Sequence, residues 1–218
     1  MRSDREKVFE LRRQGKSYRE IQELIDISRD TLSRWFRNEE WSKHIKKSNN
    51  ERNTKISILR MQQLAEGRRK MLEEKYRKVE EEAIKEFEVY KNDPLFTAGL
   101  MLYAGEGDKR SRNLTRLSNS EFHLHLVFIS FSEKFLKVGR DKIKVWLLLY
   151  PDHDIEECLE FWSVKLKVGR GNFTKSQVIL GKEKLRKLQY GVGNSIISST
   201  SLKKKMLKWL ELYKENFI

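Results

Sequence analysis

The sequence predicts an α+β fold in three parts, and three observations support this prediction. Residues 4–37 combine helix-capping residues with apolar residues at helical spacing. Residues 51–91 contain one glycine and no proline and are rich in Glu, Lys and Arg, which is typical of a long helix. Beyond Asn92-Asp93-Pro94, helical and strand-like patterns mix. We therefore expect a helical domain over 1–45, a linker helix over 46–92 and a mixed α/β domain over 93–218.

The N-terminal domain is predicted to contain three short helices. The first ends at Gly15, and Ser17 with Glu20 has the spacing of a capping box that opens the second. Ser28 caps the third helix, RDTLSRWF. The apolar positions expected to face the core are Val8, Leu11, Ile21, Leu24, Ile25, Leu32, Trp35 and Phe36.

The stretch GKSYREIQELIDISRDTLSRWFR resembles the helix-turn-helix of resolvase-type and small transposon-associated DNA-binding domains. In that motif the second helix of the pair lies in the major groove. The resemblance implies that the third helix contacts DNA, with Ser28 near a phosphate. The residues implied to face the DNA are Arg29, Thr31, Ser33, Arg34 and Arg37. A plain three-helix bundle with a solvated charged face is the alternative interpretation.

The linker helix carries an amphipathic stripe in its second half. Apolar residues recur there at steps of three and four: Leu72, Tyr76, Val79, Ala83, Phe87 and Tyr90. A rigid spacer and a dimerising coiled coil are both compatible with this pattern. Because the stripe is interrupted near 67–70, we favour a connector helix that packs back on a neighbour.

The C-terminal domain is predicted to follow the order α β α β α ββ α. Asp93 is a suitable N-cap with Pro94 at the first helical position, and Asp152 or Asp154 caps a later helix. Ser120 is expected to cap a helix that runs to Leu136. The remaining helices are expected at 155–168 and 201–213, and the strands at 113–117, 142–150, 172–180 and 190–199.

The first helix of this domain is unusual in composition. Ala98, Gly99, Ala104 and Gly105 are small residues that would let another backbone approach closely, although glycine costs about 1 kcal/mol at an interior helical site. Glu106 would lie at the C-terminal tip, where the negative end of the helix dipole disfavours a carboxylate or attracts a cation. The cations that follow would suit a phosphate backbone: Lys109, Arg110 and Arg112.

The segment GLMLYAGEG resembles the LAGLIDADG motif of homing endonucleases, whose helix ends in a small residue, an acid and a glycine. Gly105-Glu106-Gly107 matches those three positions. RLSNSEFHLHLVFISFSEKFL resembles the strand, turn and long helix that follow in the family, and the likeness covers about 94–215. Ala104 stands where the family has its first acid, and the expected element order departs from the family's αββαββα.

The resemblance implies a site and a stoichiometry. In that family two motif helices pack side by side, so that two acids hold divalent metal at the scissile phosphate. Carried over, this makes Glu106 the catalytic residue, Glu106 and Gly105 the metal-binding positions, and Mg²⁺ the cofactor. Because the chain has one such motif, a homodimer is implied. An antiparallel sheet would enter the major groove, with contacts from Arg116, Lys144, Lys175 and Gln177. The alternative for Gly-Glu-Gly is a simple turn after a buried helix.

The composition points to a polyanionic partner. The 218 residues include 46 Lys and Arg against 32 Asp and Glu, a formal charge of +14. Double-stranded DNA is the expected partner and RNA a lesser one; an anionic membrane is the alternative polyanion, although we expect no membrane partner. No run approaches the roughly 18 apolar residues that a membrane span needs. The single cysteine, Cys158, excludes an internal disulfide and a cysteine-based zinc site. We expect a cytoplasmic, nucleoid-associated protein without a secretory signal.

These patterns together predict a site-specific DNA-binding protein. As an enzyme it would be a divalent-metal-dependent DNA endonuclease of the homing type that acts as a homodimer. The alternative is a non-cleaving transcription regulator with a degenerate LAGLIDADG domain. A basic adaptor that binds RNA is a third reading.

Overall fold

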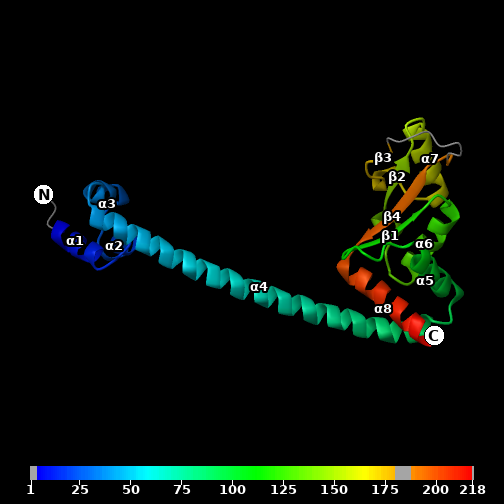
Figure 1. Ribbon diagram of the computed structural model, residues 1–218, viewed down its shortest axis with the longest axis horizontal. Coiled ribbons are helices and arrows are strands. Elements are labelled where there is room, and N and C mark those ends of the chain that lie inside the picture. The colour runs from blue at the N-terminus through cyan, green and yellow to red at the C-terminus, as the bar shows by residue number, and fades with distance from the viewer. Residues whose placement is uncertain (1–3, 180–187, 218) are drawn as a thin grey trace. The chain divides into compact units, whose positions relative to one another are not determined.

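The computed structural model describes residues 4–179 and 188–217 (Figure 1). The described residues form eight α-helices and a four-stranded sheet, so the predicted α+β class is confirmed. The chain divides into two compact units, residues 1–72 and 73–218, which we call the N-terminal unit and the C-terminal unit. The division falls inside the predicted linker helix, and each unit therefore includes part of that helix.

The N-terminal unit begins with three short helices, α1 (Arg5–Arg13), α2 (Tyr18–Leu24) and α3 (Arg29–Phe36). The predicted caps are present. Ser17 and Glu20 make both hydrogen bonds of the capping box. The Ser28 Oγ accepts a hydrogen bond from the backbone N–H of Thr31 and so caps α3. These local bonds satisfy backbone donors that a helix start would otherwise leave unpaired.

The core of this unit differs from the expected one at Leu24. Leu24 is 60% exposed, because α2 ends there and the backbone of Ile25 is already extended. Ile27 enters the core in its place. The fully or nearly buried side chains are Val8, Ile21, Ile27, Leu32 and Phe36.

The fourth helix, α4, runs without interruption from Glu40 to Tyr90. Its first turns belong to the N-terminal unit, where the Trp41 ring meets Phe36 edge-on at 5.7 Å between centroids. Its last turns belong to the C-terminal unit. There Ala83 and Phe87 are buried, and the Trp209 indole N–H donates to the carbonyl of Ala83 at 3.0 Å.

The C-terminal unit has the predicted order of elements. The helices after α4 are α5 (Pro94–Glu106), α6 (Phe122–Lys134), α7 (Ile155–Leu166) and α8 (Thr200–Phe217). The strands are β1 (Leu114–Asn119), β2 (Lys144–Leu149), β3 (Gln177–Val178) and β4 (Val192–Ser198). Two 3₁₀ turns, η1 (Arg140–Lys142) and η2 (Arg170–Asn172), precede β2 and β3. The last residue of the predicted strand 172–180 lies outside the described residues.

Two predicted caps of this unit are confirmed and one is wrong. Asp93 accepts from the backbone N–H groups of Leu95 and Phe96, and Asp154 caps α7. Ser120 does not cap α6. That helix begins one residue later than expected, with Glu121 at the N-cap and no side-chain capping bond.

The sheet has the strand order β1-β4-β2-β3. The central strand β4 runs antiparallel to β1 and to β2, whereas β2 and β3 pair in parallel. The expectation of a wholly antiparallel sheet is therefore wrong at β3. The physical reason is the connection: α7 lies between β2 and β3 and returns the chain to the starting end of the sheet, as parallel pairing requires.

Side chains alternate between the two faces of this sheet. One face is buried and includes Thr115, Leu117, Val145, Leu147, Ser195 and Ile197. Helices α6 and α7 pack on it: His125 of α6 bonds Ser195, and the Trp162 ring of α7 covers Gly193, where an added Cβ would lie 2.6 Å from the ring. The other face is partly exposed, and we call it the open sheet face.

The His125 contact predicts a pH-dependent stability. His125 is fully buried, its Nδ1 lies 2.8 Å from the Ser195 hydroxyl, and its Nε2 lies 3.1 Å from the Asn119 carbonyl. Burial lowers its pKa from 6.5 to about 4. Because the pKa of His125 is lower in the folded state than in the unfolded state, the contribution of neutral His125 to the free energy of unfolding is complete above pH 6.5. It is lost as the pH falls toward 4, by up to about 3 kcal/mol.

Chemical denaturation at a series of pH values measures this effect. We expect the free energy of unfolding to decline between pH 6.5 and 4 in the parent protein and to decline less in His125→Gln. The control is His123→Gln, because His123 is exposed. Equal pH slopes in the parent and in His125→Gln would contradict the assignment.

Candidate nucleic-acid interface

The exposed side of α3 carries most of the residues predicted to face DNA. Arg29, Ser33 and Arg34 are exposed on the helix, and Arg37 follows directly at the C-cap. No hydrogen bond or ion pair joins any of these four side chains to another residue in the part of the chain that the structure describes. On the inner side, Leu32 and Phe36 are buried in the core. A helix anchored this way presents its free cations on a rigid support.

Ser28 and Thr31 are engaged differently. The Ser28 Oγ receives the Thr31 backbone N–H and lies 2.8 Å from the Thr31 hydroxyl. Both hydroxyls therefore hold the start of α3, and Thr31 is half-buried. Their position at a helix N-terminus still leaves backbone N–H groups available to a phosphate.

The tip of α5 forms a second candidate surface. Glu106 is the last residue of α5, is exposed, and makes no hydrogen bond or ion pair with any described residue. It lines a shallow pocket of about 310 Å³, which we call the tip pocket. The other lining residues are Gly107, Asp108, Lys109, Arg110, Arg116 and Ser118. The fold thus brings together four residues predicted from the sequence, Glu106, Lys109, Arg110 and Arg116.

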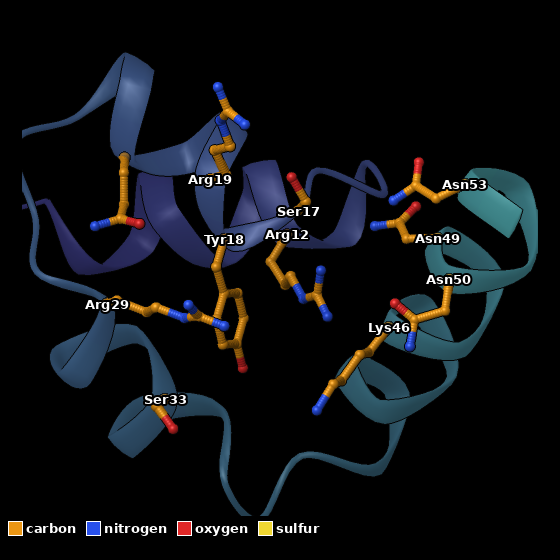
Figure 2. Close-up of a pocket in the computed structure, with 11 residues that line it drawn as sticks. Arg12, Ser17, Tyr18, Arg19, Arg29, Ser33, Lys46, Asn49, Asn50 and Asn53 are labelled. Atoms are coloured by element: carbon orange, nitrogen blue, oxygen red, sulfur yellow. The ribbon is translucent and has the colours of Figure 1, made fainter. Parts of the chain in front are cut away.

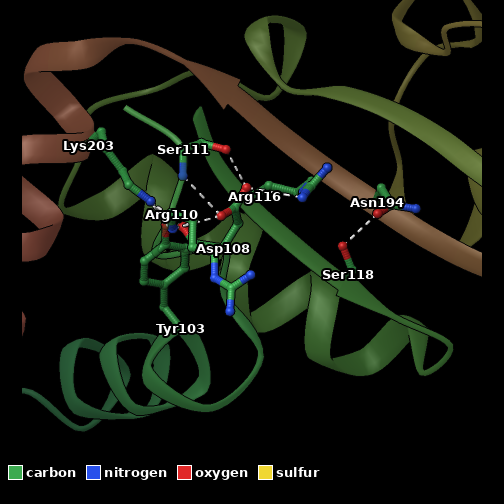
Figure 3. Close-up of polar contacts among 8 residues, drawn as sticks. All are labelled: Tyr103, Asp108, Arg110, Ser111, Arg116, Ser118, Asn194 and Lys203. Atoms are coloured by element: carbon green, nitrogen blue, oxygen red, sulfur yellow. Dashed lines mark hydrogen bonds and ion pairs between the residues drawn. The ribbon is translucent and has the colours of Figure 1, made fainter. Parts of the chain in front are cut away.

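Asp108 has a structural role that the sequence interpretation missed. Its side chain is 12% exposed and accepts hydrogen bonds from three neighbours (Figure 3). The backbone N–H of Arg110 donates at 2.9 Å, the Arg116 guanidinium at 3.0 Å, and Ser111 donates through both its hydroxyl and its N–H. The Ser111 hydroxyl bond is the main cause that lowers the pKa of Asp108 to about 2. Its carboxylate therefore stays ionised and holds the loop after α5.

A buried lysine supports the same loop from below. Lys203 of α8 is 1% exposed, and its Nζ donates to the Tyr103 hydroxyl at 2.6 Å and to the Asp108 carbonyl (Figure 3). Burial lowers the pKa of Lys203, and the nearby Asp108 charge acts in the opposite direction. The sequence holds a signal for this residue: Lys203 shares a helix face with Met206 and Leu210, both buried.

Lys109 closes the end of α5. Its Nζ donates to the Ala104 carbonyl at 2.6 Å and lies 3.4 Å from the Gly105 carbonyl. A cation at this helix end is favoured by the dipole. Here that cation is Lys109 itself. One of the two carbonyls belongs to Gly105, which the LAGLIDADG resemblance predicts to be a metal-binding position.

The carboxylates near the tip of α5 do not form a cluster in the part of the chain that the structure describes. Among the described residues, no group of three or more His, Cys, Asp or Glu side chains could hold a metal ion. Asp108 is committed to Arg116 and Ser111, so Glu106 is the only free carboxylate of the tip pocket.

The open sheet face aligns several of the remaining predicted residues. Arg116 of β1 and Lys144 of β2 both lie opposite Ile196 of β4, about 10 Å apart across two strand spacings. In the next row Ser118 donates to Asn194 at 2.6 Å (Figure 3), and Trp146 lies opposite Asn194 on the other side.

Three predicted residues lie at the margins of this face. Gln177 of β3 pairs with Leu148 and so shares the open face. Lys175 is exposed in the segment before β3, and Arg112 is exposed in the loop before β1. None of the three lines the tip pocket. Arg116 is the only predicted residue that belongs to both surfaces, and its Nε is buried without a hydrogen-bond partner among the described residues.

The small residues of α5 divide into two groups. Gly99 is buried against Phe131 of α6, so its size serves packing within the chain. Ala98 and Gly105 are exposed, with Met101 between them, and Ala104 is half-buried. Positions 98, 101 and 105 share one side of the helix, which leaves a narrow exposed strip available to a second helix.

In the ranges 4–179 and 188–217, no helix has both the length and the hydropathy that a bilayer crossing requires. No protein-family model, curated protein or solved structure matches this chain.

Proposed function

We propose that this protein binds double-stranded DNA at specific sites through α3 and the open sheet face. The observation that carries the proposal is the row of four free polar side chains, three of them arginines, on the exposed side of α3. The formal charge of +14 favours any polyanion, and the rigidly mounted helix favours a duplex groove over a flexible strand.

The chemistry of α3 suits base reading in a major groove. An arginine can donate two parallel hydrogen bonds to O6 and N7 of guanine, and such a pair contributes about 1–3 kcal/mol of discrimination. Arg29 and Ser33 lie one turn apart on the helix, while Arg34 and Arg37 lie near its end. The helix-turn-helix likeness of the sequence agrees with this use of α3.

The open sheet face would provide a second contact area. Arg116 and Lys144 flank Ile196, and the amides of Asn194 and Gln177 lie on the same face. Arginine and lysine bind phosphates or guanine, and amide side chains suit adenine. A mixed row of this kind can both position a duplex and read its bases.

DNA cleavage is the activity that we propose for Glu106, in a homodimer with LAGLIDADG-like ancestry. Glu106 is a free carboxylate in a pocket otherwise rich in cations, which would draw a phosphodiester toward it. The Glu106 carboxylates of the two protomers would hold Mg²⁺, which when bound would supply an activated water and stabilise the leaving oxygen. Arg110 and Arg116 would hold the phosphate, and Asp108 would keep Arg116 in place.

A non-cleaving regulator is the second candidate, and Lys109 favours it. The ammonium of Lys109 already occupies the carbonyls of Ala104 and Gly105, and Asp108 is unavailable as a second acid. A chain that neutralises its own helix end in this way can bind DNA without cutting it. The two candidates share the DNA-binding surface and differ at Glu106.

One substitution separates the two candidates. A DNA site is first selected from a random-sequence pool and cloned into a plasmid. For the endonuclease, we expect the parent protein to linearise this plasmid with Mg²⁺. Glu106→Gln should bind with equal affinity but cut more than about 100-fold more slowly, because substituting residues that only orient a metal's ligands already costs up to about 100-fold in activity.

The control is Glu121→Gln, an exposed acid outside the tip pocket. Binding without cutting by all three proteins favours the regulator. Failure to enrich any duplex sequence, with no binding to duplex DNA at low salt, contradicts the proposal as a whole.

A further inference from the structure

A basic groove lies in the N-terminal unit, on the side of α3 that faces α4. It has a volume of about 570 Å³ and is lined from four helices, α1 to α4 (Figure 2). Figure 2 shows Arg29 and Ser33 on one side and Lys46 and Asn50 on the other, with Arg12 and Tyr18 between them. The full lining is Arg12, Ser17, Tyr18, Arg19, Gln22, Arg29, Ser33, Lys46, Asn49, Asn50 and Asn53. We call this the α3–α4 groove.

The first turns of α4 are fixed to the three short helices by two side chains. Arg12 of α1 is 2% exposed and donates to the Ser42 hydroxyl at 2.9 Å, to the Ser42 carbonyl at 2.8 Å and to the Lys16 carbonyl at 2.7 Å. Two turns further along α4, the Asn49 amide donates to the Gly15 carbonyl at 2.9 Å. The α4 wall of the groove is therefore held in place before any ligand arrives, which lowers the entropy cost of binding.

The groove carries positive charge and unused hydrogen-bonding groups. Besides the buried Arg12, the cations are Arg19, Arg29 and Lys46, and no Asp or Glu is among the lining residues that the structure describes. Lys46, Asn50 and Asn53 recur at steps of four and three, so they share one side of α4. Neither these three side chains nor Arg29 and Ser33 bond any other residue within 4–179 and 188–217.

The shape of the charged surface indicates a polymer rather than a single anion. Along α4 the groove continues into a neighbouring hollow of about 500 Å³, with which it shares Lys46 and Asn50. That hollow is lined by Lys43, Lys46, Lys47, Asn50, Glu51, Thr54 and Lys55. A track of this length exceeds what one phosphate can use, but it matches the repeated charge of a nucleic-acid backbone.

We propose that the α3–α4 groove binds the sugar–phosphate backbone of the duplex that α3 reads, so that the start of α4 is a further DNA-contacting element. This inference rests on the proposed function and extends it to residues that the sequence did not indicate. Arg29 connects the two surfaces, because it belongs to α3 and also lines the groove. Lys46 would bind a phosphate by charge, and Asn50 and Asn53 would bind through neutral amides.

A salt titration of DNA binding tests the inference. The probe is a fluorescent random-sequence duplex of about 30 base pairs, and salt is varied from about 50 to 200 mM. We expect Lys46→Gln to reduce the slope of log affinity against log salt by about 0.9, the value for one lost phosphate contact. Asn50→Ala should weaken binding without changing the slope, because an amide carries no charge. Lys75→Gln, on α4 but outside the groove, is the matched control and should leave the slope unchanged.

Each result decides between defined outcomes. If the parent binds the duplex and Lys46→Gln and Asn50→Ala match it in affinity and slope, the groove inference is wrong while the proposed function stands. If the parent binds no duplex at all, both fail together. Duplex DNA is not the occupant if the substitutions weaken binding to an RNA hairpin only. The same holds if inorganic phosphate displaces the duplex at constant ionic strength. Thermal midpoints equal to the parent's show that the variants are folded.

Discussion

Arg12→Gln is expected to destabilise the N-terminal unit by about 1–3 kcal/mol for each buried acceptor that it leaves without a donor. The Arg12 guanidinium makes hydrogen bonds to both the hydroxyl and the carbonyl of Ser42 and to the Lys16 carbonyl, and it stacks over Tyr18 at 4.9 Å. A shorter amide cannot reach all of these acceptors, so buried carbonyls would lose their donors. Since small domains have total stabilities of about 5–15 kcal/mol, this loss would release α1 from α4.

Hydrogen exchange of the α1 and α4 amides, together with chemical denaturation, measures this effect. The matched control is Arg34→Gln, because Arg34 is exposed and forms no bond with any described residue. We expect Arg34→Gln to keep the parent's stability within about 0.5 kcal/mol but to lose DNA discrimination. Unchanged exchange in Arg12→Gln would show that Ser42 and Lys16 find water instead, and that α4 is not anchored by this side chain.

Gly99→Ala is expected to destabilise the C-terminal unit by about 1–3 kcal/mol, even though alanine is the better helix former. A Cβ at position 99 would lie 2.6 Å from the Cβ of Phe131, an atom that cannot swing aside. Phe131 is fully buried among Phe96, Phe135 and Trp209, so α5 and α6 would have to separate. Denaturant titration followed by tryptophan fluorescence gives the change in the free energy of unfolding.

Gly105→Ala makes the same chemical change on the same helix and is the control. An added Cβ there meets nothing within 4 Å, so we expect no loss, and up to about 1 kcal/mol of gain from helix propensity. If Gly99→Ala were as stable as Gly105→Ala, the close approach of α5 to α6 could not be the reason for glycine at position 99.

The parts of the fold that sequence patterns predicted are the local ones. Ser17 with Glu20, Ser28, Asp93 and Asp154 cap helices where expected, because a capping bond joins residues at most three apart. The order of helices and strands after Pro94 was also predictable, since each element has its own periodicity. Glu106 at the tip of α5 follows from the glycine after it.

The parts that were missed depend on residues far apart in the chain. Lys203 donates a hydrogen bond to Tyr103, which is 100 positions away in the chain. No local sequence pattern indicates which partner a buried lysine binds. The hydrogen bond from Arg116 to Asp108 forms only once β1 has placed Arg116 beside the loop, so no local pattern indicates it. The parallel pairing of β3 depends on where α7 returns the chain, which periodicity does not encode.

The Lys109 ammonium at the end of α5 has a consequence for every other cation. A short stretch of its own chain ties it to α5, so its effective concentration at the Ala104 and Gly105 carbonyls is at least in the millimolar range. A cation from solution has to displace Lys109 from these carbonyls. Its apparent affinity for them is therefore lower than it would be without Lys109. The helix end is thus neutralised by a cation of the chain itself.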